Sequence, residues 1–123
     1  MAESGSSAGI WLYSDDQIFS DRIASTASSL SIPFLRIGDA DLANLPSHRG
    51  LLIVDLDKGL TPVQRAIALA RSADPDSWHI CGYGAHVDAD GLRALRDAGA
   101  DRVVSRARLM QNLQDIIQES LTR

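Results

Sequence analysis

Carboxylates that follow two short apolar runs are the residues of this sequence best suited to chemistry. Asp55 comes directly after the run at 51–54, and Asp15 and Asp16 come just after the run at 10–13. A run of this kind, with no helical period, predicts a strand covered on both faces, as in the middle of a parallel sheet. The carboxyl ends of such strands are where open α/β sheets bind ligands. Asp55 could therefore react, bind a ligand, or simply end its strand and cap the following loop.

Strands and helices alternate along the chain, and this alternation would position the acids. Five strands are predicted, at 10–13, 34–37, 50–55, 79–83 and 102–105. Five helices are predicted, at 18–30, 41–45, 62–74, 89–98 and 109–121, and Gly99 is expected to end the fourth. Connections too long for hairpins imply parallel strands, and right-handed crossovers then give a doubly wound sheet with helices on both faces. The predicted fold is a flavodoxin-like, three-layer α/β/α domain with strand order 2-1-3-4-5. In this order the first and third strands are neighbours, so Asp15, Asp16 and Asp55 would share one crevice.

Capping patterns predict where two of these helices begin. Ser14, three residues before Gln17, predicts a capping box for the first helix, and Thr61 predicts another for the third. Acids in the first turn of a helix are favourable without any metal. Asp16 is therefore expected to be solvated, whereas Asp15 could be either a metal ligand or an ordinary first-turn acid.

Size and composition predict one domain and argue against several classes of partner. The 123 residues are 45% hydrophobic, which suffices for one core at 10–123, after a leader at 1–9 that is expected to be disordered. The formal net charge is −4 without a prominent run of Lys or Arg, which argues against a nucleic-acid groove or an anionic membrane surface. No stretch approaches the roughly 20 apolar residues of a membrane span. The single cysteine, Cys81, fits a reducing compartment, so a cytoplasmic location is expected.

Three stretches give the chain a resemblance to a known family. Leu51–Asp55, Ala98–Val104 and Ala73–Asp76 together resemble the receiver domain of bacterial response regulators, and the resemblance runs from Ile10 to the end of the chain. It implies a two-component or phosphorelay signalling protein. In that family an acid pair after the first strand and an aspartate ending the third bind Mg²⁺. The third-strand aspartate accepts a phosphoryl group from a histidine kinase.

Carried over by position, the resemblance assigns part of that site to this chain. Asp55 matches the phosphoacceptor and an Mg²⁺ ligand, and Asp15 matches the second acid of the pair, while Ser14 stands in the place of the first. The backbone carbonyl of Asp57 matches the remaining protein ligand of the metal. Ser14 and Asp16 are candidate modulators of the pocket.

Two further positions depart from the family pattern. The position of the hydroxyl side chain that contacts the phosphoryl group falls on Gly84, and the lysine position falls on Arg106. Because one carboxylate of the pair is also lost at Ser14, Mg²⁺ would bind weakly or not at all. Arginine keeps the positive charge but replaces a compact ammonium with a rigid fork. The acceptor Asp55 thus remains while its supporting groups are depleted, which favours a divergent receiver, or pseudo-receiver.

A histidine could replace part of the missing groups. His86 lies two residues after Gly84, and Asp57 lies two residues after Asp55. In the receiver family these two flanking positions influence how fast the phosphoryl group is lost. The hypothesis is that His86 and Asp57 face each other across the pocket and pair. The alternative is a loop histidine that faces water.

The resemblance predicts a signalling module rather than an enzyme. Because no output domain follows Arg123, a standalone module is expected, which would act by binding a histidine kinase or a downstream effector. The fourth helix, fifth strand and closing helix would form the face for that partner or for a homodimer. An alternative of another class is a flavodoxin-like domain that binds a small ligand, or acts as an enzyme, in the same crevice. The lack of a glycine-rich phosphate loop after the first strand counts against this alternative.

Overall fold

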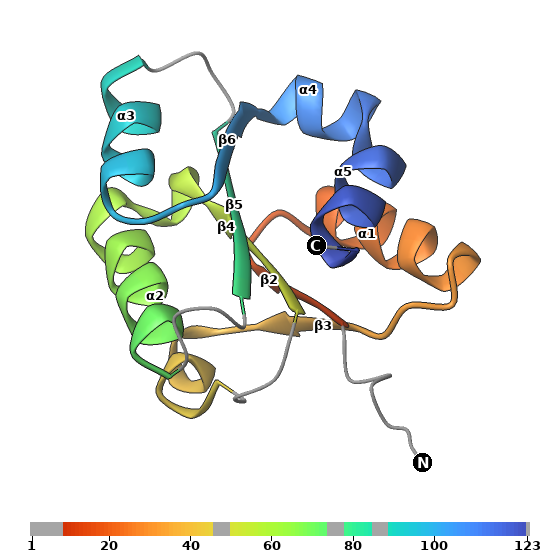
Figure 1. Cartoon of the computed structure of the whole chain (residues 1–123), viewed down its shortest axis with the longest axis horizontal. Helices are drawn as coiled ribbons and strands as arrows, with labels where there is room; N and C mark the ends of the chain where they lie inside the picture. Colours follow the sequence, from red (N-terminus) through yellow and green to blue (C-terminus); the bar gives the residue numbers. More distant parts are fainter. Residues whose placement is uncertain (1–8, 46–49, 74–77, 85–88, 123) are drawn as a thin grey trace.

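The computed structural model describes residues 9–45, 50–73, 78–84 and 89–122, which contain a five-stranded sheet (Figure 1). Its strands are β2 (Gly9–Tyr13), β3 (Phe34–Ile37), β4 (Gly50–Asp55), β5 (Trp78–Gly84) and β6 (Arg102–Ser105). The order across the sheet is β3-β2-β4-β5-β6, and every neighbouring pair is parallel. The predicted order 2-1-3-4-5 is therefore confirmed, with β4 at the centre of the sheet.

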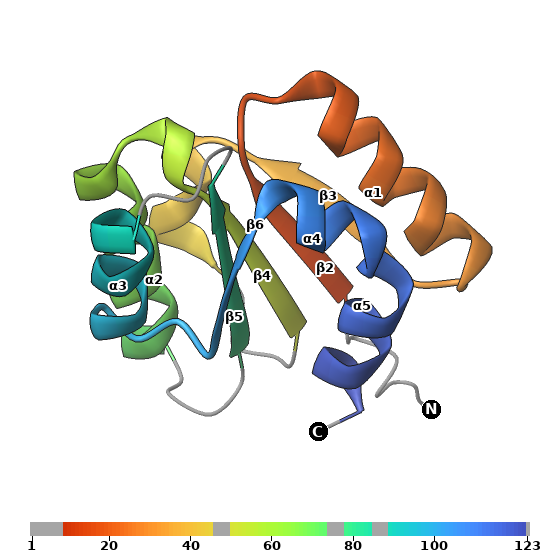
Figure 2. The ribbon, with the colours of Figure 1, turned by 90° about the horizontal axis from the view of Figure 1, so that it is seen from above.

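Helices cover both faces of this sheet (Figures 1 and 2). One face is covered by α1 (Gln17–Ser29), α4 (Arg106–Gln111) and α5 (Leu113–Leu121). The other is covered by α2 (Leu60–Ala73), α3 (Ala89–Asp97) and the 3-10 helix η1 (Asp39–Asn44). A second 3-10 turn, η2 (Leu56–Lys58), follows β4. The predicted three-layer α/β/α arrangement is confirmed.

The burial of β4 explains why the central apolar run has no helical period. All six of its residues are buried. Leu51 and Ile53 pack under α1 and α5, whereas Leu52 and Val54 pack under α2 and η1. Each such aliphatic side chain contributes about 1.5–3 kcal/mol on burial. Since side chains alternate along a strand, Asp55 follows Leu51 and Ile53 and lies on the α1 side at the carboxyl edge.

Three local boundaries differ from those expected. Helix α1 is capped by Asp16, whose carboxylate accepts a backbone N–H of the first turn, so the capping box at Ser14 is wrong. Helix α2 begins at Leu60, which places Thr61 inside the first turn and not at the cap. The helix expected at 41–45 is the 3-10 helix η1, which begins two residues earlier.

The ends of other elements are partly as expected. The closing helix breaks at Asn112, whose φ of −119° and ψ of 24° are not helical, into α4 and α5. Gly9, assigned to the leader, is the first residue of β2. Gly99 follows α3 as predicted, and its φ of +118° is a conformation that suits glycine. Ile18, at the start of α1, and Ala68, in α2, are apolar but exposed. Within the described ranges, no helix is both long enough and apolar enough to cross a membrane.

Candidate functional site

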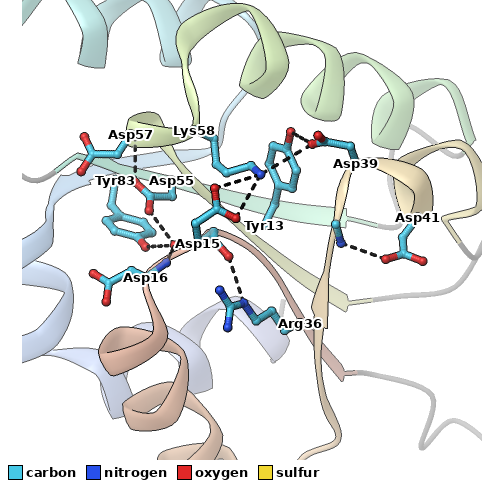
Figure 3. Close-up of polar contacts among 12 residues, drawn as sticks. Tyr13, Asp15, Asp16, Arg36, Asp39, Asp41, Asp55, Asp57, Lys58 and Tyr83 are labelled. Atoms are coloured by element: carbon cyan, nitrogen blue, oxygen red, sulfur yellow. Dashed lines mark hydrogen bonds and ion pairs between the residues drawn. The ribbon is translucent and has the colours of Figure 1, made fainter.

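Asp55 lies at the carboxyl end of β4 and is almost fully buried (Figure 3). Only 4% of its surface is exposed. Its Oδ2 accepts a hydrogen bond from the Ser14 hydroxyl at 2.6 Å, and its Oδ1 accepts one from the backbone N–H of Asp57 at 2.9 Å. Each carboxylate oxygen is therefore held by a donor from an adjoining loop, one after β2 and one after β4.

A buried chain of hydrogen bonds extends from Asp55 to β5. Ser14 is 2% exposed, and its Oγ accepts the backbone N–H of Asp16 at 3.0 Å and the Tyr83 hydroxyl at 3.1 Å. The Tyr83 ring packs against Phe19 with ring centroids 4.6 Å apart. Burial raises the pKa of Tyr83 far above its ordinary value, and the nearby charge of Asp55 acts in the same direction. The hydrogen bond to Ser14 acts against this rise in pKa but is outweighed by burial, so the phenol keeps its proton and donates it to Ser14 Oγ.

Tyr83 belongs to this cluster although sequence reasoning did not single it out. It is the register partner of Asp55 in the neighbouring strand and precedes Gly84 by one residue. Two neighbouring parallel strands with matching register point such partners to the same face of the sheet. A tyrosine directly opposite the candidate acceptor was the signal available in the sequence.

Asp16 and Arg106 join the start of α1 to the start of α4. Both Nε and Nη2 of Arg106 donate to Oδ2 of Asp16, at 2.9 and 2.6 Å, and the guanidinium lies 5.4 Å from the centroid of the Phe19 ring. The backbone N–H of Phe19 lowers the pKa of Asp16, burial opposes this, and Arg106 lowers it further. The expectation that Asp16 is solvated is wrong, because its charge is paired with Arg106.

Asp15 lies outside this buried chain and pairs with Lys58 (Figure 3). The Asp15 side chain is 81% exposed, and each of its oxygens accepts from Nζ of Lys58 at 3.2 Å. The Lys58 side chain is only 14% exposed, because its ammonium lies 4.8 Å above the Tyr13 ring and 3.7 Å from Oδ1 of Asp39. The structure thus brings Ser14 to Asp55, but holds the predicted metal ligand Asp15 against an internal cation.

The remaining predicted positions are placed as follows. Gly84 is the last residue of β5, opposite Ser105 in register, and offers no side chain to the site. Asp57 is an exposed residue of η2, and its backbone N–H donates a hydrogen bond to Asp55. His86 lies outside the described residues, so its pairing with Asp57 stays a hypothesis.

Comparison with known proteins bears on the fold. No protein-family model matches the chain, and no curated protein matches it. A response regulator from Thermotoga maritima matches with 17% identity and a TM-score of 0.68, over 94% of this chain and 99% of its own. The phosphorylated cyanobacterial phytochrome response regulator RcpA matches with 14% identity and a TM-score of 0.70, over 94% of each chain. An atypical orphan response regulator matches with 15% identity and a TM-score of 0.68, over 92% of this chain and 94% of its own.

The chain has the fold of a response regulator receiver domain. The identities are low, so the likeness establishes the architecture and leaves function to be argued from the site.

Receiver folds imply an Mg²⁺ ion beside the acceptor aspartate, and the residues of this chain fit it poorly. Mg²⁺ is held in proteins by carboxylates that have oxygens to give, together with water. Here Oδ2 of Asp55 already accepts a hydrogen bond from Ser14. Asp16 is paired with the guanidinium of Arg106, and Asp15 is paired with the ammonium of Lys58. Among the described residues, no group of three or more His, Cys, Asp or Glu side chains is arranged to hold a metal ion. Asp16 and Asp15 are thus paired with cations of the chain itself, Arg106 and Lys58.

Proposed function

We propose that this chain is a receiver-like signalling module that acts by binding a protein partner, and that it does so without phosphorylation of Asp55. The observation that carries the proposal is the closure of Asp55, which is 4% exposed and accepts one hydrogen bond on each carboxylate oxygen. An acceptor must present an oxygen in line with an incoming phosphoryl group. To do so, Asp55 would first have to lose the Ser14 bond.

The groups that would stabilise a transferred phosphoryl group are also missing or committed. Phosphoryl transfer depends on positioning and on charges that neutralise the transition state. Gly84 has no hydroxyl to donate, and the guanidinium of Arg106 is directed at Asp16. These features support a degenerate pocket whose acceptor is kept as a structural residue.

One structural neighbour gives a precedent for signalling of this kind. The atypical orphan response regulator is described as having a phosphorylation-independent regulatory mechanism. A similar mode would suit this chain, in which the internal hydrogen bonds of Asp55 would hold the partner surface in a single state. Under this proposal the chain has no enzymatic activity of its own.

The partner surface is proposed to be the face formed by α3, β6, α4 and α5. Strand β6 lies at the edge of the sheet, and Val103 and Val104 in it are only partly buried. An edge strand flanked by helices offers apolar side chains and backbone groups to a second protein. The partner would be a histidine kinase, an effector, or a second copy of this chain. The homodimer is tested by sedimentation equilibrium, in which the Val103→Glu variant is measured beside the unaltered protein.

The chemical part of the proposal is tested by incubating the protein with acetyl phosphate and Mg²⁺ and measuring its intact mass. We expect no phosphoryl adduct, because Asp55 is closed and the supporting groups are absent. An adduct that disappears in Asp55→Asn would contradict the proposal. An unrelated protein with an open acceptor aspartate, treated in parallel, shows that the phosphodonor is active.

The alternative function, a ligand or enzyme site in the same crevice, has no support from this geometry. The side chains of Ser14 and Asp55 have almost no exposed surface to offer a ligand. Native mass spectrometry of the purified protein tests this alternative, since a co-purified flavin or nucleotide would favour it.

A further inference from the structure

A cavity lies on the face of the sheet opposite to the side chain of Asp55. It has a volume of about 240 Å³ and is formed by the end of β2, by η1 and by the first turns of α2. Its lining consists of Tyr13, Asp39, Leu42, Thr61, Pro62 and Arg65. Asp55, Ser14 and Asp16 do not line it, so binding there can be tested separately from the candidate acceptor.

The lining of this cavity divides into an apolar floor and a polar rim. Tyr13 and Leu42 are buried and Pro62 is half-buried, whereas Thr61 and Arg65 are exposed. A largely apolar concavity with a few polar groups at its mouth is the usual form of a small-molecule site. Since a water molecule occupies about 30 Å³ of liquid, the volume corresponds to about eight water molecules and suits a ligand of about that many non-hydrogen atoms.

The rim carries one negative and one positive group. The Asp39 carboxylate is held by the Tyr13 hydroxyl and lies 3.7 Å from Nζ of Lys58, and its side chain is still 73% exposed (Figure 3). These two groups, and more weakly Arg65, hold the pKa of Asp39 below its ordinary value, so it stays ionised near neutral pH. Among the described residues, no hydrogen bond or ion pair engages the guanidinium of Arg65. Asp39 and Arg65 thus flank the cavity without pairing with each other.

We propose that this cavity binds a small zwitterion with a short apolar group, namely a free aliphatic α-amino acid. Its ammonium would donate to Asp39, and its carboxylate would accept from Arg65 and Thr61. Its side chain would lie on Leu42 and Pro62. Asp39 would keep Tyr13 and Lys58 beside it, so the ligand ammonium adds a further contact there. A ligand without a carboxylate would cover Arg65 and leave its charge unpaired, which disfavours simple cations.

The proposal is tested by adding three matched compounds to the full chain and following backbone amides by NMR. The probes are L-leucine, N-acetyl-L-leucine, which lacks the ammonium, and L-leucinamide, which lacks the carboxylate. We expect saturable shifts for L-leucine at residues of β2, η1 and the start of α2, with a Kd of about 1–10 mM, and at least tenfold weaker binding of both analogues. Equal binding of either analogue, or no saturation by L-leucine up to about 50 mM, overturns the proposal.

Substitutions assign the binding to this cavity. Arg65→Gln is expected to weaken L-leucine at least tenfold and to abolish its advantage over L-leucinamide, because the variant lacks the charge that would bind the carboxylate. Arg93→Gln, which removes an exposed arginine of α3, is the matched control and should leave the affinity unchanged. If Arg65→Gln does not fold, Thr61→Val is the second variant. An unchanged affinity for L-leucine in the folded variant contradicts the assignment of binding to this cavity. This outcome does not depend on the result of the phosphodonor experiment.

Discussion

Two polar clusters lie at the same edge of the sheet and differ in burial. The buried cluster consists of Asp55, Ser14 and Tyr83, and the surface cluster consists of Lys58, Asp15 and Asp39. In the first, every member has 4% or less of its surface exposed. In the second, the two carboxylates are 81% and 73% exposed and share one ammonium.

This difference in burial decides which cluster keeps Asp55 hydrogen-bonded and out of contact with solvent. Breaking a hydrogen bond to a buried group leaves that group desolvated and unpaired, which costs about 1–3 kcal/mol. An exposed ion pair is replaced by water at a cost of about 0–1 kcal/mol. The buried cluster should therefore hold Asp55 closed, while the surface cluster should adjust with little effect on stability.

The largest effect is expected from Ser14→Asp, which replaces the donor to Asp55 with a second buried carboxylate. Two like charges that are both out of water should lower the free energy of unfolding by about 2–4 kcal/mol. Added Mg²⁺ should recover part of this loss, because the pair then resembles a hard-cation site. Urea denaturation with and without Mg²⁺ measures both effects. The comparison fails if the variant is as stable as the unaltered protein.

A smaller loss is expected from Tyr83→Phe, which removes the hydroxyl that donates to Ser14. The Ser14 Oγ keeps the N–H of Asp16, so the expected cost is about 1–2 kcal/mol. Tyr13→Phe is the matched control, since Tyr13 is equally buried but its hydroxyl bonds the exposed Asp39. Thermal denaturation should rank Tyr83→Phe as the more destabilised; the reverse order would refute the distinction between the clusters.

An intermediate effect is expected from Asp16→Ala. Asp16 belongs to neither cluster, but it caps α1 and pairs with Arg106. Loss of the cap should cost about 1 kcal/mol at neutral pH. The pKa of Asp16 in the folded protein lies below its ordinary value of 3.8. Its contribution is therefore present above about pH 4 and is lost as the pH falls through the lowered folded pKa. Denaturation from pH 7 to pH 2 should show the variant and the unaltered protein converging in acid, and a constant difference would contradict this.

The smallest effect is expected from Lys58→Met, which removes the cation of the surface cluster. The midpoint of thermal unfolding should change by less than about 5 °C, and the difference should shrink further in 0.5 M NaCl. Calorimetry at two salt concentrations measures this. A drop as large as that of Ser14→Asp would place Lys58 among the residues that hold the site together.

The fold was predictable because it follows from patterns that few other arrangements satisfy. The buried run at 51–54, its neighbours in the sheet and the stop at Gly99 each reflect a local requirement of a parallel sheet or a helix end. The same patterns located Asp55 at the carboxyl edge. No long-range information was needed for these conclusions.

The contacts of the site were less predictable because they depend on side-chain direction. Ser14 fits a capping pattern by spacing, yet a turn that directs its hydroxyl to Asp55 leaves the cap to Asp16. The pairing of Asp16 with Arg106 joins residues 90 positions apart, and no spacing rule relates them. Ion pairs of this kind are decided by tertiary packing, which the order of residue types does not encode locally.

The most direct test of the central claim is an Mg²⁺ titration followed at the backbone amide of Asp57, which donates to Oδ1 of Asp55. If the donors of this chain occupy Asp55, this amide should show no saturable shift up to about 20 mM Mg²⁺. A saturable shift centred on Asp57, Ser14 and Tyr83 would mean that the carboxylate opens to a metal, and the account of a closed, phosphorylation-independent module would be wrong.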